Sequence, residues 1–151
     1  MAELGEANIG GRMVPAWLLN GNANGLDISE SSEHPGCFYR KLSDGGVEWF
    51  NPPMLLGVEY RTTERYLGKP VYVKAVDFES LPNTTRKEKP HGVSNIDKVI
   101  SVIGQESNGM PLPRVNVAYL WANLENVYIE TQADVSANTA TLIIKCTKTT
   151  D

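Results

Sequence analysis

The chain has 151 residues, of which 41% are hydrophobic and 21% charged, and its formal net charge is −4. This composition fits one globular domain with a hydrophobic core, and it excludes a disordered chain. The net charge is negative, whereas nucleic-acid-binding proteins carry basic patches, so we expect no nucleic-acid partner. No apolar run reaches the roughly 20 residues of a membrane span, and the first residues show no secretory signal, so we expect no membrane insertion.

The N-terminal segment, residues 1–35, is rich in glycine, asparagine and serine and has weak helical periodicity. A short apolar run around Trp17 is surrounded by small polar residues, a pattern typical of a loop or an extended arm. Such an arm buries little apolar surface in a monomer, so we expect it to lie on a neighbouring subunit. Trp17 is a candidate intersubunit contact. The predicted organisation is an arm over 1–35 and a β-domain over 36–151.

From Cys37 onward the pattern changes to that of β-strands. The run CFYRKL is a candidate strand, SDGG is a turn in which Asp and Gly tolerate positive φ, and VEWF is a candidate return strand. The following NPPM ends the pairing, because neither proline donates a backbone hydrogen bond.

Two longer strands are predicted over residues 58–66 and 70–78, the first with one apolar or aromatic face and one charged face. A two-residue loop between them would place Arg61 directly opposite Lys74, and facing like charges destabilise a sheet. We therefore predict a three-residue loop, which places Arg61 opposite Ala75.

The C-terminal half alternates loops and strands. Residues 80–95 are polar and hold two prolines, which predicts a solvated loop. Residues 98–104 are rich in β-branched side chains, which predicts a strand. In the next strand, one face is shared by Val115, Val117, Tyr119 and Trp121. The residues predicted to point inward in the last two strands are Val127, Ile129, Leu142, Ile144 and Cys146.

About seven or eight short strands with turn signals between them, and no convincing helical segment, predict an all-β protein. We expect an antiparallel β-sandwich, jelly-roll-like, with an extended irregular N-terminal arm.

The two cysteines, Cys37 and Cys146, lie far apart and form neither a disulfide framework nor a metal motif. We expect free, buried cysteines in a protein assembled in a cytoplasm, and a single bridge between them is the alternative.

No catalytic motif is recognisable in the sequence. His34 and His91 show no spacing typical of a catalytic triad, and we expect both to be plain surface or loop residues. Glu59 and Glu64 point to opposite faces of one predicted strand, so they cannot form a glycosidase pair. We predict a non-enzymatic protein with no catalytic residue, no metal site and no cofactor.

Aromatic side chains beside polar ones are the features best suited to binding. The apolar face of a sugar ring stacks on Trp or Tyr, while polar side chains meet the hydroxyl groups. The candidate ligand contacts are Trp49, Tyr119 and Trp121. The alternative for each of them is a structural role in the core or in a subunit interface, because aromatic residues are common in strands. Further candidates for intersubunit contacts are Tyr60, Arg61 and Arg65.

The stretch NPPMLLGVEYRTTERYLGKPVYVKAVDFESLPN resembles the C-terminal domain of bacteriophage fibre proteins, in particular tail fibres and related virion appendages. Those chains carry a similar N-P-P-M, then G-x-E-Y-R-T-T-E-R, G-K-P-V-Y and L-P-N. The later segments HGVSNIDKVISVIG and ATLIIKCTKTTD are similar to the closing strands of that family. The resemblance covers about residues 49–151 and is strongest over its first third.

This resemblance implies a non-enzymatic virion protein that forms a homotrimer and meets the host surface through a glycan or a protein. It brings no ligand residues. Because few residues precede the matching part, we expect a head fibre, a capsid decoration protein or a fibre tip. Its arm would dock on other virion proteins after assembly in the host cytoplasm. The alternative is a monomeric carbohydrate-binding module of a secreted bacterial protein, whose aromatic side chains form a flat platform.

Overall fold

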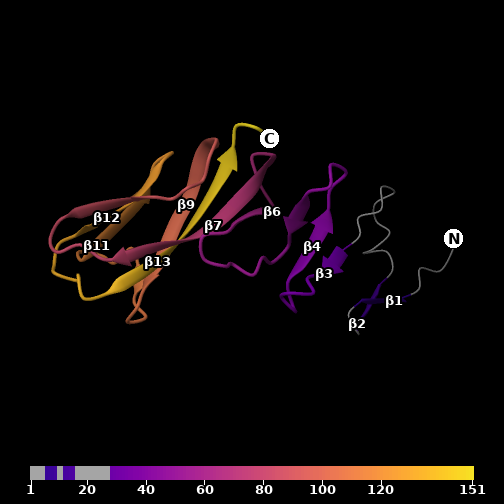
Figure 1. Cartoon of the computed structure of the whole chain (residues 1–151), viewed down its shortest axis with the longest axis horizontal. Helices are drawn as coiled ribbons and strands as arrows, with labels where there is room; N and C mark the ends of the chain where they lie inside the picture. The colour runs from indigo at the N-terminus through magenta and orange to yellow at the C-terminus, as the bar shows by residue number, and fades with distance from the viewer. Residues whose placement is uncertain (1–5, 10–11, 16–27) are drawn as a thin grey trace. The chain divides into compact units, whose positions relative to one another are not determined.

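The structure is a computed structural model that describes residues 6–9, 12–15 and 28–151. The chain divides into two compact units, Met1–Pro53 and Met54–Asp151. The described residues form strands, turns and loops and contain no helix, which confirms the predicted all-β class (Figure 1). The same residues therefore offer no helical segment with the length and apolarity of a membrane span.

The first unit holds two small antiparallel sheets within its described part, β1 with β2 and then β3, β4 and β5 side by side. Their bounds are β1 (Glu6–Ile9), β2 (Arg12–Pro15), β3 (Ile28–Glu30), β4 (Phe38–Lys41) and β5 (Val47–Trp49). Strands β4 and β5 match the predicted hairpin. Strands β1, β2 and β3 lie within the segment predicted as an irregular arm, whose described residues therefore include paired strands. The first unit ends at Pro53.

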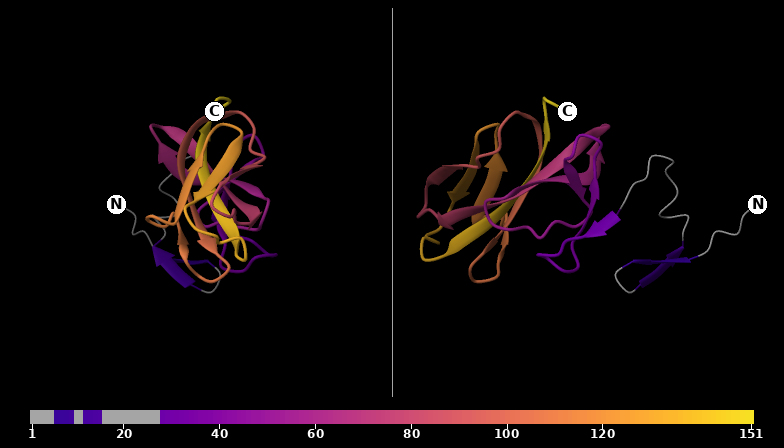
Figure 2. Two further views of the ribbon diagram at one scale, coloured as in Figure 1. Left: turned by 90° about the vertical axis from the view of Figure 1, so that its left-hand side faces the viewer. Right: turned by 45° about the vertical axis from the view of Figure 1, so that its right-hand side comes forward.

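The second unit is a sandwich of two antiparallel sheets, which confirms the predicted architecture (Figures 1 and 2). Within this unit the large sheet has the order β10-β9-β13-β7-β6, and the small sheet has the order β11-β12-β8. The bounds are β6 (Glu59–Tyr66), β7 (Lys69–Ser80), β8 (Arg86–Pro90), β9 (Ile96–Glu106), β10 (Pro111–Leu112), β11 (Ala118–Ala122), β12 (Asn126–Thr131) and β13 (Thr139–Lys148).

The facing sides of the two sheets form one hydrophobic core. Phe78 on β7 and Leu142 on β13 meet Ile129 on β12, and all three are fully buried. Burying a side chain of this size stabilises the fold by roughly 1.5–3 kcal/mol. The inward positions predicted on β12 and β13 are confirmed, because all five side chains are buried. Both cysteines are free, and Cys146 lies in this core.

The hairpin of β6 and β7 turns through two residues, Leu67 and Gly68, and not through the predicted three. Both residues have positive φ, 50° and 81°. Positive φ at both central positions is the geometry of a type I′ turn, whose twist matches that of the flanking strands. The sequence signal is weak here, because leucine rarely occupies the first of these positions.

The register of this hairpin shifts along the strands, so that Arg61 lies opposite Tyr72 and not opposite Ala75 as predicted. The shift places Glu59 opposite Lys74. The like-charge pair that a regular two-residue hairpin would create is therefore avoided by an irregularity inside the strand, and a pair of opposite charges replaces it.

The segment predicted as a solvated loop, residues 80–95, contains strand β8, which pairs with β12. Its side chains alternate without an apolar face: Arg86 and Glu88 are exposed, whereas Lys87 and Lys89 are half-buried. The segment has no alternation of apolar and polar residues, so its sequence does not indicate a strand. Backbone pairing with β12 makes it one.

His91, predicted to be a plain surface or loop residue, lies in the loop after β8 but is buried there, with 2% of its surface exposed. Its Nδ1 accepts a hydrogen bond of 3.0 Å from the backbone N–H of Val93, and its Nε2 lies 3.3 Å from the carbonyl oxygen of Asn123. Since Nδ1 accepts, Nε2 carries the proton and donates, so the ring is neutral. Burial, the largest cause, lowers the pKa of His91 below its ordinary 6.5.

The turn geometry predicts opposite effects of two substitutions. Leu67→Asn creates the Asn-Gly pair that type I′ turns favour, so we expect the free energy of unfolding to rise by about 1 kcal/mol. Gly68→Ala forces a Cβ into positive φ, and we expect a loss of about 1 kcal/mol. Urea denaturation measures both. Since a Cβ at Gly68 would meet no atom within 4 Å, a loss there reports backbone strain alone. Equal stability of the two variants would contradict the turn.

The neutral state of His91 predicts acid sensitivity. Its folded pKa lies below that of the unfolded chain, so the unfolded chain binds the proton more readily. The stability that this group contributes is present above about pH 6.5 and is lost as the pH falls below it. We expect urea denaturation at about pH 5 to show lower stability than at about pH 7.5. We expect His91→Gln to lack this part of the pH dependence.

Two carboxyl groups with shifted pKa values act outside this window. A hydrogen bond from Lys69 lowers the pKa of Asp97, and one from Ser136 lowers the pKa of Asp134, both from 3.8. Their contributions to stability are lost only at a more acidic pH. If His91→Gln and the natural chain lost stability equally between the two pH values, the role of His91 would be refuted.

Candidate binding face

The outer side of the small sheet carries a group of aromatic side chains. Along β11, Ala118 is fully buried against the core, whereas Tyr119 is 45% exposed. By the same alternation Trp121 points to the outer side, and on β12 Tyr128 does so between buried Val127 and Ile129. We call Tyr119, Trp121 and Tyr128 the aromatic face.

The rings of this face are arranged by the strand register. Trp121 lies directly opposite Tyr128 on the neighbouring strand. The two ring centroids are 5.3 Å apart and the ring planes differ by 4°, so the rings stack in parallel. Tyr119 lies two residues before Trp121 on the same strand, roughly 7 Å away along it. The three rings therefore form one apolar surface across two strands.

Asn123 holds the turn between the two aromatic strands. Its Oδ1 accepts hydrogen bonds from the backbone N–H groups of Glu125, at 2.8 Å, and Asn126, at 2.7 Å. Its Nδ2 donates to the hydroxyl of Tyr128 at 2.9 Å. The backbone carbonyl oxygen of Asn123 is the partner of the buried His91. One side chain thus fixes both the turn and the orientation of the Tyr128 ring.

Charged side chains border the aromatic face. On β8, Glu88 lies opposite Tyr128. Glu130 on β12 lies between Tyr119 on one side and Arg86 on the other. We call Arg86, Glu88 and Glu130 the polar rim. A surface that combines hydrophobic rings with carboxylate and guanidinium groups is suited to a ligand with both apolar and polar parts.

A buried ion pair fixes the start of β11. Glu106 on β9 has a fully buried side chain, and its Oε1 lies 3.2 Å from Nε of Arg114, an ion pair by distance in which the two atoms do not meet in hydrogen-bond geometry. Its Oε2 accepts a hydrogen bond of 3.0 Å from Asn138. The backbone of Arg114 in turn exchanges hydrogen bonds with Ala118, of 2.8 and 2.9 Å. The pair therefore ties the strand that carries Tyr119 to the edge of the large sheet.

The sequence candidates for ligand contact fall in two different units. Tyr119 and Trp121 both belong to the aromatic face in the second unit. Trp49 lies on β5 in the first unit, half-buried, with its ring 5.2 Å from that of Tyr39 at an angle of 53°. Trp49 stays a candidate ligand contact because it is an aromatic residue, but it does not belong to the aromatic face.

Three of the candidates for intersubunit contact, Tyr60, Arg61 and Arg65, contact residues of their own unit. The hydroxyl of Tyr60, which is buried, accepts from the N–H of Leu55 at 3.4 Å. Arg61 forms an ion pair of 3.0 Å with Asp151, and Arg65 donates to the carbonyl oxygen of Thr62 at 3.2 Å. Their intersubunit role stays a prediction, and Trp17 lies outside the described residues.

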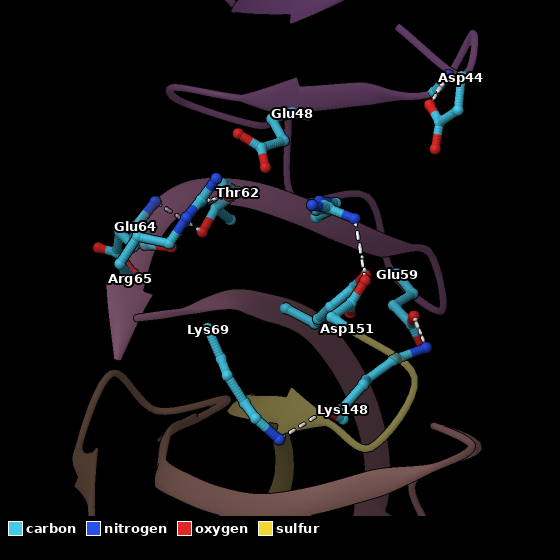
Figure 3. Close-up of polar contacts among 12 residues, drawn as sticks. Asp44, Glu48, Glu59, Thr62, Glu64, Arg65, Lys69, Lys148 and Asp151 are labelled. Carbon is cyan, nitrogen blue, oxygen red and sulfur yellow. Dashed lines mark hydrogen bonds and ion pairs between the residues drawn. The ribbon is translucent and has the colours of Figure 1, made fainter. Parts of the chain in front are cut away.

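Strand β6 is held to the C-terminal segment by charge pairs, which Figure 3 shows around Asp151 and Lys148. Lys148 bonds to Glu59 and lies 4.6 Å from the centre of the Tyr72 ring. Burial is the largest cause that raises the pKa of Tyr72 to about 12, so its hydroxyl stays protonated. Glu59 and Arg61 of the EYRTTERY motif therefore tie β6 to the C-terminal segment.

Sequence reasoning missed Tyr128 and Asn123. A signal for Tyr128 was present, because the correctly predicted inward positions of Val127 and Ile129 place the residue between them on the outer side. Its partnership with Trp121 depends on the cross-strand register. No local pattern indicated Asn123, because its role comes from four contacts that the folded turn brings together.

The described residues contain no group of three or more His, Cys, Asp or Glu side chains that could hold a metal ion. Comparisons with protein-family models, with curated proteins and with solved structures find no match to this chain.

The buried ion pair predicts a large effect of one substitution. Arg114→Ala leaves the Glu106 carboxylate buried without its charged partner, so we expect a loss of about 3 kcal/mol in the free energy of unfolding. The matched control is Arg86→Ala, on the exposed side of the small sheet, for which we expect a change within about 0.5 kcal/mol. Urea denaturation measures both. Similar losses in the two variants would show that the pair is unimportant.

Proposed function

We propose that this chain is a structural and adhesive component of a bacteriophage virion, a fibre tip or a head-fibre or capsid-decoration protein. The aromatic face is the observation that carries the proposal. Three aromatic rings gathered on the outer side of a sheet, with charged side chains around them, form a surface suited to attachment. The ligand is a glycan or a protein on the host surface.

The resemblance to phage fibre proteins supports the virion assignment. The matching residues form the β6–β7 hairpin and the strands that follow it, so the shared motif belongs to the framework of the sandwich. A framework motif is compatible with many binding surfaces, because function belongs to the site and not to the fold.

A homotrimer is the proposed assembly, with the first unit contributing to contacts between subunits and with other virion proteins. The fibre family implies threefold assembly. In such an oligomer each subunit presents its own aromatic face, and several weak contacts made together hold more firmly than one.

The second candidate is a monomeric carbohydrate-binding module of a secreted bacterial protein. The parallel stack of Trp121 and Tyr128 favours it too, because the outer face of a stacked ring can receive the apolar face of a sugar ring. The two candidates differ in assembly, and the oligomeric state separates them.

The virion proposal predicts the mass of the purified full chain in solution. We expect light scattering after size exclusion to give three times the chain mass of 16.6 kDa, independent of loading concentration over about a tenfold range. A stable monomer would favour the carbohydrate-binding module.

The aromatic face also predicts separate effects on assembly and adhesion. We expect Trp121→Ala to keep the mass of the natural chain, since the face binds the host and not another subunit. We expect the same variant to adhere less to a panel of bacterial cells that the natural chain labels. A change to monomer would identify the face as a subunit interface and refute its role in adhesion.

A further inference from the structure

We propose that the aromatic face binds an uncharged oligosaccharide, with a sugar ring stacked on Trp121, and discriminates against anionic glycans. This inference rests on the proposed function, because it names the ligand class of the same face. It depends on three properties of the face: parallel rings, hydrogen-bonding groups beside them and an excess of negative charge.

The ring geometry favours a flat, apolar ligand surface. Trp121 and Tyr128 lie within 4° of parallel, so they form a stack and not a box around a central space. A cationic group such as an alkylammonium is bound best when several rings surround it. The C–H face of a pyranose ring needs one open aromatic face, which a stacked pair offers on its outer sides.

Hydroxyl groups of a sugar find partners beside the rings. The hydroxyl of Tyr128 accepts a hydrogen bond from Asn123, which leaves its own O–H to donate. Glu88 lies opposite this ring, and Glu130 lies opposite Tyr119. Ionised carboxylates accept hydrogen bonds only, and sugar hydroxyls are donors that match them.

The charge around the face disfavours an anionic ligand. Two carboxylates of the polar rim, Glu88 and Glu130, stand against one guanidinium group, Arg86. The lysines of β8 do not compensate them. They lie on the alternate positions of the strand, where Lys87 donates to Ser80 and Lys89 pairs with Glu79.

The consequence is selectivity by charge. At physiological ionic strength, salt screens charges that are more than about 8 Å apart. A carboxylate closer than this to a bound ligand still repels a negative charge on it. A glycan with a carboxylate or phosphate on each unit meets repulsion along the rim, whereas an uncharged glycan of the same length does not.

Calorimetric titration of the full chain tests this inference. The neutral probes are cellohexaose, chitohexaose and maltohexaose, and the anionic probe of equal length is hexagalacturonate. We expect at least one neutral hexasaccharide to bind with a Kd of about 1 mM or lower, and hexagalacturonate to bind at least about tenfold more weakly. We expect Trp121→Ala to weaken the neutral probe by about tenfold.

Matched variants separate binding from folding. Trp49→Ala removes a tryptophan from the first unit and is expected to keep the affinity, and Trp121→Phe keeps a ring and is expected to retain most of it. The double variant Glu88→Gln with Glu130→Gln removes the charge that repels anions. We expect it to bind hexagalacturonate more tightly than the natural chain does.

Three results would overturn the inference: no binding of any neutral hexasaccharide, binding of hexagalacturonate as tight as that of the neutral probes, or unchanged affinity in Trp121→Ala. A chain that is trimeric and adheres to cells while binding no neutral hexasaccharide would retain the proposed function with a different ligand. A monomer that binds the hexasaccharide would retain the glycan site and lose the virion assignment.

Discussion

The apolar sides of the two sheets in the second unit bury each other, and the positions of the other side chains follow from this contact. Phe78, Ile129 and Leu142 meet between the sheets, fully removed from water. Since side chains alternate along a strand, each residue committed to this core sends its neighbours to the outer side. A shift of one residue in β12 would exchange the buried Ile129 for Tyr128, so the core specifies the register and thereby the aromatic face.

Charged groups are placed by pairing within this framework. Glu106 is fully buried beside the half-buried Arg114, and the pair ties β11 to the large sheet. Glu59 lies opposite Lys74 because β6 shifts its register. The histidine beneath the turn of β11 and β12 is kept neutral by burial and by the hydrogen bond that its Nδ1 accepts from Val93. These polar contacts select one geometry among those that the hydrophobic pattern alone would allow, because each unpaired buried group would be costly.

The proposed role combines a rigid platform with weak, repeated attachment. A sheet holds its side chains more firmly than a loop does, so the stacked rings are ordered before any ligand arrives, and little conformational entropy is lost on binding. The proposed stacking of one sugar ring on Trp121 would give modest affinity. Repetition of the face over the subunits of a trimer would raise the avidity without a new contact, which suits an appendage that samples a cell surface.

Much of the fold follows from local patterns in the chain. Alternation and turn residues predicted the all-β class, most of the strands and the inward residues of β12 and β13, because these features depend on neighbouring residues alone. Strand β8 and the burial of His91 were not predicted, since both depend on partners distant in the sequence, and the two-residue turn was missed because leucine rarely occupies its first position. The aromatic face lies between these cases: Tyr119 and Trp121 were recognisable as candidates, but their union with Tyr128 and Asn123 requires the pairing of β11 with β12. Strand pairing is a long-range contact, and its register is set by the burial of the whole sheet.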